Sequence, residues 1–175
     1  ERYILSSRPK LLKMFNSVLP ITMEKNVCVI SFRGGEYRAI SKVLLPPSYY
    51  ENAMACVLTV NPQAKFVVVT DDYRFARMYF QQIPIVSSRK IPFMRYLVLH
   101  PRSKNIGKDF TYIQRAQYLI LSNSSFSWWG AWSNQRNPFV VAPKYWANHN
   151  ANDGFWSLGD SMTEGWRWLD KNGAF

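Results

Sequence analysis

The sequence predicts an α/β fold, a Rossmann-like parallel sheet flanked by helices. Short β-prone apolar runs recur along the 175 residues, and stretches of helical length separate them. Strands that alternate with helices favour a parallel sheet with right-handed crossovers. Polar clusters follow three of the apolar runs, and open parallel sheets bind ligands beyond the carboxyl ends of their strands. The length suggests one domain, and we expect its ligand site at that edge.

Five short runs are the expected strands. Each is rich in valine, isoleucine or leucine and is bounded by turn residues, as buried strands are. In chain order they cover residues 27–32, 66–72, 83–88, 118–125 and 138–144. Residues 91–100 form a further apolar stretch, and its pattern does not distinguish a strand from a helix.

Helical segments lie between these runs. We expect helices over residues 3–15, 48–60, 73–81 and 107–117, and a loop followed by a short helix over 146–168. Pro9 is expected to interrupt the first helix early. Proline is favoured in the first turn of a helix, so Pro47 or Ser48 is the expected start of the second.

The charge and the aromatic content indicate classes of partner. The formal net charge is +11, which favours nucleic acid, acidic lipid or a phosphorylated ligand. The basic residues are scattered, which argues against a disordered nucleic-acid arm. A nucleic-acid binder is suggested by the charge alone, and the sequence lacks a basic helix or an aromatic RNA-binding signature, so we expect no nucleic-acid partner and keep an anionic membrane surface as a candidate. A solvated basic face without a specific partner explains the charge equally well. The 16% aromatic content indicates a heavily packed core, a sugar-stacking surface or both.

Metal, disulfide and membrane signals are missing from the sequence. Cys28 and Cys56 form no CxxC pair, and we expect two buried free thiols. His100 and His149 are far apart without a ligand partner nearby, so no metal site is predicted. No signal peptide is visible and no apolar run reaches the roughly 18 residues of a membrane span. We expect a cytoplasmic protein or one peripheral to a membrane.

The first polar cluster follows the strand at residues 27–32. Arg33 offers a planar fork of donors that suits a phosphate, and Gly34 and Gly35 let the backbone approach a ligand closely. Glu36 and Tyr37 follow. The alternative is a surface turn with a solvated arginine. The segment is neither a Walker loop nor a GxGxxG fingerprint.

The second cluster ends the strand at residues 66–72. Asp71 and Asp72 are candidates to accept hydrogen bonds from a base or ribose, to hold a metal, or to act as a base. The alternative is that they cap the helix that follows, and capping is the expected role of one of the two.

The third cluster, SNSSFSWWGAW at residues 122–132, predicts a strand end, a polar turn and the first turn of a helix. This arrangement aims backbone N–H groups and hydroxyls at one spot, as in phosphate sites. The alternative is a packed aromatic helix, and Trp129 and Trp132 are expected in the core. The Asn-Ser-Ser triplet matches a glycosylation sequon, but a site at the end of a buried strand is poorly accessible. The candidate ligand-binding residues are Asn123, Ser124, Ser125, Phe126 and Ser127.

Together the three clusters resemble family eleven of the glycosyltransferases, the α-1,2-fucosyltransferases, over residues 26–168. SNSSFSWWGAW resembles the family's signature almost letter for letter, and FVVVTDD is similar to its strand ending in Ser/Thr-Asp-Asp. VISFRGGEY resembles the segment His-x-Arg-x-Gly-Asp-Tyr. LPPSYYENA and VVAPKYW resemble the Leu-Pro-x-x-Tyr-Tyr helix start and the Pro-Lys-x-Trp segment.

The sequence departs from the family's pattern at three positions in the first cluster. Ser31 stands where the family has His, Gly34 replaces a second Arg, and Glu36 replaces Asp, whereas Arg33 is kept. These departures keep a second function open: a catalytically degenerate module that binds a nucleotide sugar or a glycan.

The resemblance implies a GT-B enzyme, in which two Rossmann-like halves face each other across a cleft. This chain resembles the C-terminal, donor-binding half. Residues 26–175 are then the domain that binds the GDP-sugar, and residues 1–25 are a segment leading from a missing or reduced acceptor half.

The resemblance also implies the reaction. Fucose is transferred from GDP-β-L-fucose to a glycan or glycolipid hydroxyl with inversion, in an α-1,2 linkage and without a metal or other cofactor. Arg33 and the N–H groups near residues 125–127 stabilise the departing GDP. Asp72, with Asp71 second, holds guanine or ribose, and Glu36 is the candidate base for the acceptor hydroxyl.

Overall fold

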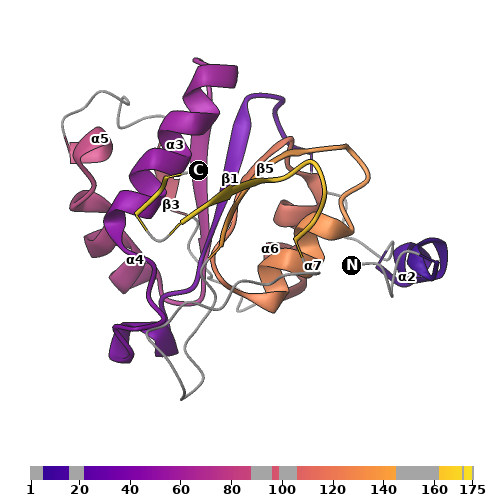
Figure 1. Cartoon of the computed structure of the whole chain (residues 1–175), viewed down its shortest axis with the longest axis horizontal. Helices are drawn as coiled ribbons and strands as arrows, with labels where there is room; N and C mark the ends of the chain where they lie inside the picture. Colours follow the sequence, from indigo (N-terminus) through magenta and orange to yellow (C-terminus); the bar gives the residue numbers. More distant parts are fainter. Residues whose placement is uncertain are drawn as a thin grey trace.

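The computed structural model describes residues 6–15, 22–87, 96–98, 106–144, 162–170 and 172–174. Within these residues, six strands form one sheet in the order β3-β2-β1-β4-β5-β6, with helices on both faces (Figure 1). Every neighbouring pair of strands is parallel. The predicted α/β fold with a parallel sheet flanked by helices is confirmed.

The strands are short and the central ones are buried on both faces. They are β1 (Val27–Phe32), β2 (Lys65–Thr70), β3 (Tyr96–Val98), β4 (Tyr118–Ile120), β5 (Phe139–Pro143) and β6 (Arg167–Leu169). Parallel strands covered on both faces need apolar residues throughout, which explains why β1 reads VCVISF without alternation. β1 lies between β2 and β4, so the segments that follow these three strands emerge side by side.

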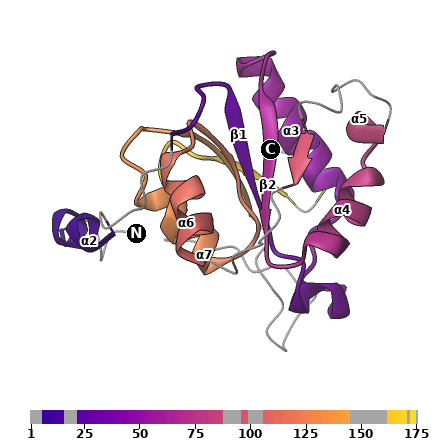
Figure 2. The same cartoon turned by 180° about the vertical axis from the view of Figure 1, so that it is seen from behind.

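The helices form two layers. They are α2 (Arg8–Phe15), the 3-10 turn η1 (Glu36–Ala39), α3 (Pro47–Val60), α4 (Tyr73–Gln81), α5 (Pro84–Ser87), α6 (Ile106–Arg115) and α7 (Ser125–Trp132). α3 and α4 cover one face of the sheet, and α6 and α7 cover the other (Figures 1 and 2). In the described part of the chain, no helix is long and apolar enough to cross a membrane.

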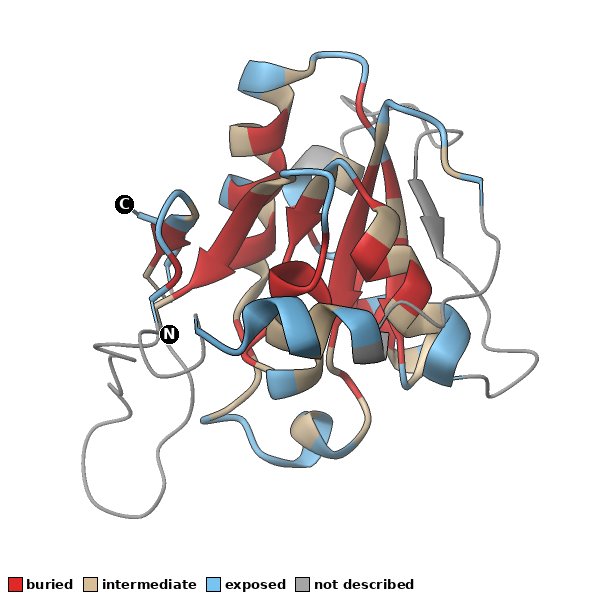
Figure 3. Cartoon of the chain, turned by 90° about the vertical axis from the view of Figure 1, so that its right-hand side faces the viewer, coloured by how far each residue is buried: buried red, intermediate tan, exposed pale blue. Residues whose placement is uncertain are grey.

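Two apolar clusters, one on each face of the sheet, make the core (Figure 3). Alternate residues of β1 point to opposite clusters: Ile30 and Phe32 pack with α3 and α4, and Val29 packs with α6 and α7. The Phe32 ring lies 5.0 Å from that of Tyr79 and 5.2 Å from that of Phe80, between ring centroids. This packing fixes the end of β1, from which Arg33 emerges.

The predicted third strand, residues 83–88, is wrong. Residues Pro84–Ser87 form the helical turn α5, and β3 is Tyr96–Val98, within the stretch whose type the sequence left open. Pro84 explains the difference, because proline lacks an N–H for the ladder and fits the first turn of a helix. Ile83 is buried, so the apolar signal of this run reports packing against the core rather than a strand.

Two further expectations are corrected. The tail ends in the strand β6 and not in a short helix, because Trp168 and Leu169 are buried against the sheet and pair with β5. Pro9 lies in the first turn of α2, where proline is tolerated, and does not interrupt the helix. Residues 145–161, and with them His149, lie outside the described residues, as does His100.

Both cysteines are free thiols, as predicted. Cys28 is buried in β1, and burial raises its pKa well above the usual value. Cys56 is only half-buried, so the expectation of burial is confirmed for Cys28 alone.

Candidate functional site

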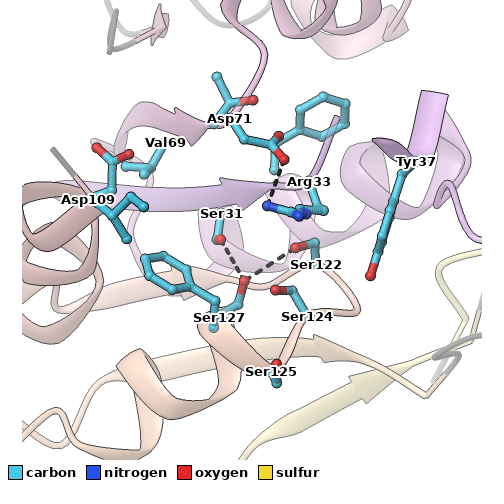
Figure 4. Close-up of a pocket in the computed structure, with 14 residues that line it drawn as sticks. Ser31, Arg33, Tyr37, Val69, Asp71, Asp109, Ser122, Ser124, Ser125 and Ser127 are labelled. Carbon is cyan, nitrogen blue, oxygen red and sulfur yellow. Dashed lines mark hydrogen bonds and ion pairs between the residues drawn. The ribbon is translucent and has the colours of Figure 1, made fainter. Parts of the chain in front are cut away.

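A cavity of about 390 Å³ lies at the carboxyl ends of β1, β2 and β4 (Figure 4). Its lining comes from the last residues of β1 and β2, from the segments that follow β1, β2 and β4, and from the first turns of α6 and α7. The three polar clusters of the sequence all contribute: Arg33 from the first, Asp71 from the second, and residues 122–127, which we call the serine segment, from the third. The predicted meeting of these segments at one edge of the sheet is therefore present in the structure.

Arg33 occupies the polar side of the cavity. Its Nη1 lies 2.7 Å from Asp71 Oδ2, and its guanidinium carbon lies 5.8 Å from the centre of the Tyr37 ring. The Arg33 side chain remains 40% exposed. Burial raises the pKa of the Tyr37 phenol, which stays protonated and donates a hydrogen bond to the Asn123 carbonyl at 3.2 Å.

The amino end of α7 faces the same side of the cavity. Ser124 is the N-cap residue, but its side chain makes no capping hydrogen bond. The first N–H groups of a helix have no partner within the helix and carry a partial positive charge. Since Ser124, Ser125 and Ser127 also line the cavity, this end of α7 and Arg33 present donors and positive charge to one space.

Ser31, Ser122 and Ser127 form a three-serine cluster at the base of the cavity. The Ser127 hydroxyl lies 2.6 Å from that of Ser31 and 3.3 Å from that of Ser122, and all three residues are buried. The cluster ties β1, the end of β4 and α7 together. Ser31, which stands where the resemblance places His, is thus engaged with α7.

The opposite side of the cavity is largely apolar. Val69 and Asp109 lie there, away from Tyr37 (Figure 4), and the cavity lining also includes Ile106, from the same helix as Asp109, and Phe126. We call this the apolar side. Burial raises the pKa of Asp109, and the nearby Lys108 partly offsets this rise. Among the described residues, no group of three or more His, Cys, Asp and Glu is placed to hold a metal ion.

Sequence reasoning missed Asp109 and Ile106. An acidic residue in the first turn of a helix is ordinary, since it complements the helix dipole. The only available signal was their place in the helix that directly precedes the strand and the serine segment. In the structure, α6 packs against α7.

Several predicted site residues lie outside the cavity lining. Asp72 caps α4, accepting a hydrogen bond from Phe75 N at 3.0 Å, and pairs with Arg38 at 2.8 Å. Capping by one of the two aspartates was expected, and Asp72 is that residue. Its carboxylate is directed to α4 and Arg38 rather than to the cavity.

Asn123 and Glu36 also lie outside the cavity lining: Asn123 has a structural hydrogen bond, and Glu36 is exposed to solvent. Asn123 is buried, and its side chain donates to the Val43 carbonyl at 2.8 Å, which holds the loop before α3 against the serine segment. Glu36 begins η1 and is exposed. Neither residue lines the cavity.

The tryptophans of the third cluster are mostly structural. Trp132 is 2% exposed and stacks on Trp128, so its expected place in the core is confirmed. Trp129 is half-buried and is not part of the fully buried core. Gly34 and Gly35 do not line the cavity; their backbone approaches the Asp71 carboxylate instead.

Comparison with known proteins relates the chain to glycosyltransferases. The model of glycosyl transferase family 11 matches residues 12–169. The O-antigen biosynthesis glycosyltransferase WbnK of Escherichia coli is 29% identical over 104 residues, which cover 59% of this chain and 32% of WbnK. An alpha-1,2-colitosyltransferase of Escherichia coli is 25% identical over 188 residues, which cover 98% of this chain and 60% of that protein.

The chain thus spans less than two thirds of the length of either relative. The family match covers more of this chain: it extends over residues 12–169 and so includes every residue that lines the cavity. Because this match extends over most of the sequence, the protein belongs to glycosyl transferase family 11.

Proposed function

We propose that the protein is a glycosyltransferase that binds a GDP-sugar in this cavity. In the proposal the sugar is fucose or a close relative, and it passes with inversion to a glycan or glycolipid hydroxyl, forming an α-1,2 linkage. One observation carries the proposal: the Arg33 guanidinium and the amino end of α7 face a single cavity at the carboxyl edge of the sheet.

The polar side of the cavity suits a diphosphate. A guanidinium binds phosphate oxygens through two parallel hydrogen bonds, and a helix amino end adds backbone donors and positive potential. When the bond between sugar and phosphate breaks, negative charge grows on the departing diphosphate. Fixed donors aimed at that charge stabilise the transition state more than the ground state, which is how they accelerate the transfer. No metal is needed for this role in the proposal.

The apolar side suits a nucleobase. Val69, Ile106 and Phe126 offer surfaces for a flat ring, and Asp109 offers a carboxylate beside them. Guanine presents two neighbouring N–H donors on one edge, which match the two oxygens of a carboxylate. We therefore assign recognition of guanine to Asp109 in preference to Asp72, whose carboxylate is engaged by α4 and Arg38.

The proposal also specifies the donor sugar and the place where the acceptor binds. The name of one relative specifies colitose, which differs from fucose by the loss of one ring hydroxyl. Both GDP-fucose and GDP-colitose are therefore the donors to compare. The acceptor is proposed to bind across the open side of the cavity, held by a second Rossmann-like half as in GT-B enzymes. Glu36, exposed beside the cavity-lining Tyr37, is the proposed base.

Thermal unfolding with nucleotides tests the donor. GDP, GDP-fucose or GDP-colitose at a hundred times its Kd should raise the Tm by roughly 5 to 10 °C, because binding to the native state alone stabilises it by about 2.7 kcal/mol. ADP at the same concentration should give a much smaller shift. If no guanine nucleotide protects the protein, or if ADP protects it equally, the proposed donor is wrong.

A second candidate function is a non-catalytic module that binds the nucleotide sugar. The departures at Ser31 and Gly34 favour it, and the Ser31 hydroxyl is engaged by Ser127 rather than free toward a ligand. Transfer and hydrolysis of GDP-fucose by the longest native form separate the two. An enzyme turns the donor over and loses that activity in R33A, whereas a module binds GDP-fucose and leaves it intact.

A further inference from the structure

The Asp71 carboxylate holds the turn that carries Arg33. Its Oδ1 accepts hydrogen bonds from the backbone N–H groups of Gly34, at 2.9 Å, and Gly35, at 3.0 Å. Its Oδ2 pairs with Arg33 Nη1 at 2.7 Å. One side chain at the end of β2 thus engages three donors from the segment that follows β1, so both of its oxygens are used.

Gly35 makes this approach sterically feasible, and Gly34 leaves room for the Phe32 ring. A Cβ on Gly35 would lie 2.8 Å from Asp71 Oδ2, and a Cβ on Gly34 would lie 2.7 Å from the Phe32 ring. Gly35 has a φ of −41°, so the requirement is for space and not for a left-handed backbone. The glycines bring the backbone against a carboxylate of the protein itself.

Arg33 keeps donors for a ligand while it is held. A guanidinium has five N–H donors, and the bond to Asp71 occupies the Nη1 end. Figure 4 shows Arg33 between Asp71 on one side and the serine segment on the other. Asp71 does not use the remaining donors, and Arg33 lines the same cavity as the amino end of α7.

We propose that Asp71 is a positioning residue, which orients Arg33 and its turn for the diphosphate of the nucleotide sugar and makes no contact with the base or the ribose. This inference rests on the proposed function. A long, half-exposed arginine loses much rotamer freedom when it binds an anion, and a side chain that is already held loses less. Asp71 supplies that hold before the ligand arrives.

The negative charge of Asp71 acts in the opposite direction, since it repels a diphosphate. The repulsion is weakened because the Asp71 and Arg33 side chains are 28% and 40% exposed, so water and salt screen it. Loss of a defined guanidinium position has a larger effect, because two-point binding of phosphate depends on orientation. We therefore expect removal of the charge to weaken diphosphate binding.

Binding of GDP and of guanosine to D71N, measured by calorimetry, tests this role. Asparagine keeps an oxygen for the two glycine N–H groups and removes the partner of Arg33. We expect GDP to bind about tenfold more weakly and guanosine to bind as to the wild type. D72N is the matched control: it alters the neighbouring carboxylate and the pair with Arg38, and it should leave both affinities unchanged. If D71N weakens guanosine as much as GDP, or leaves GDP binding unchanged or tighter, the positioning role is wrong.

A double mutant tests whether Asp71 acts through Arg33. If it does, R33A/D71N should bind GDP no more weakly than R33A, because the second change removes nothing further. Independent losses that add would contradict the proposal.

Hydrogen exchange of the Gly34 and Gly35 amides tests, without any ligand, whether the Asp71 carboxylate binds these two N–H groups and so holds the turn. Protection should be present in the wild type, kept in D71N and lost in D71A. Fast exchange in the folded wild type would overturn the hold, whatever the protein binds. Slow exchange in a wild type that binds no GDP would instead overturn the proposed function and leave the hold intact.

Discussion

The two sides of the cavity differ in how the chain builds them. The polar side comes from two contiguous segments, the turn at Arg33 and the start of α7, each next to the end of a central strand. The apolar side draws single residues from separate elements: Val69 from β2, Asp109 and Ile106 from α6, and Phe126 from α7. The charged lining is concentrated in short motifs, whereas the apolar lining is dispersed over the fold.

This difference assigns separate tasks to the two sides. Under the proposed function, the polar side binds the diphosphate and contributes to catalysis, because charge develops there. The apolar side selects the base, because the Asp109 carboxylate lies there among apolar side chains. A change on one side should then alter one part of the ligand's affinity and leave the other part intact, and each prediction below uses that separation.

Replacement of Arg33 by alanine should have the largest effect. Loss of a charge-assisted, two-point contact costs about 2 to 3 kcal/mol, or roughly a hundredfold in GDP affinity. Guanosine lacks the diphosphate and should bind equally to both proteins. Calorimetry with the two ligands measures this, with R38A as control, since Arg38 is the neighbouring arginine and pairs with Asp72 outside the cavity. Equal loss for GDP and guanosine would show that the two sides do not act separately.

Replacement of Asp109 by asparagine should have a smaller effect, and it should weaken GDP and guanosine equally. An amide has one acceptor and one donor group where the carboxylate has two acceptors, so it fits the edge of guanine poorly. We expect about a tenfold loss for GDP and for guanosine alike, corresponding to about 1.4 kcal/mol. The preference for GDP over ADP should fall by the same factor. E164Q, which alters the exposed acid Glu164 before β6, is the control. If D109N keeps the wild-type preference for GDP over ADP, Asp109 does not recognise the base.

The acidity of Asp109 adds a pH dependence to this difference. Burial raises its pKa above the usual range of an aspartate, and only the charged form accepts both hydrogen bonds from guanine. Guanosine affinity should therefore be constant near neutral pH and fall as the pH drops through this raised pKa. The fall should begin at a higher pH than for an unperturbed carboxyl. Calorimetric titration with guanosine at several pH values measures this dependence. If D109N shows the same pH dependence, the group that titrates is not Asp109.

The polar side of the cavity could be predicted from the sequence, whereas most of the apolar side could not. Arg33, Asp71 and the serine segment were placed at one edge because each follows an apolar run, and parallel strands bring such ends together. Asp109 and Ile106 were missed because their signal is an ordinary amphipathic helix, and their role depends on how α6 packs. Residues 83–88 were assigned to the wrong element since apolar residues report burial, and only Pro84 carries the information that breaks the strand.

Asp71 and Asp72 show the limit of sequence reasoning within a single motif. The two carboxylates are neighbours in the chain and follow the same strand. One holds the Arg33 turn at the cavity, and the other caps α4 away from it. Nothing in the order of the letters distinguishes them, because the direction of each side chain depends on where β2 ends and α4 begins.

Ser31 should give the smallest effect, since it lies beneath the polar side without contributing charge. Ser31→Ala removes the 2.6 Å hydrogen bond to Ser127, which keeps Ser122 as a partner, so the expected cost is about 0.5 to 1.5 kcal/mol of unfolding free energy. The Tm should then fall by roughly 1 to 6 °C, with GDP affinity changed less than about threefold. Ser133→Ala is the matched control, because Ser133 is a buried serine at the other end of α7 that also bonds through its hydroxyl. Equal losses of Tm in both variants with GDP affinity retained would confine the serine cluster to a structural role. A tenfold loss of GDP affinity in S31A alone would instead extend the phosphate-binding side of the cavity down to β1.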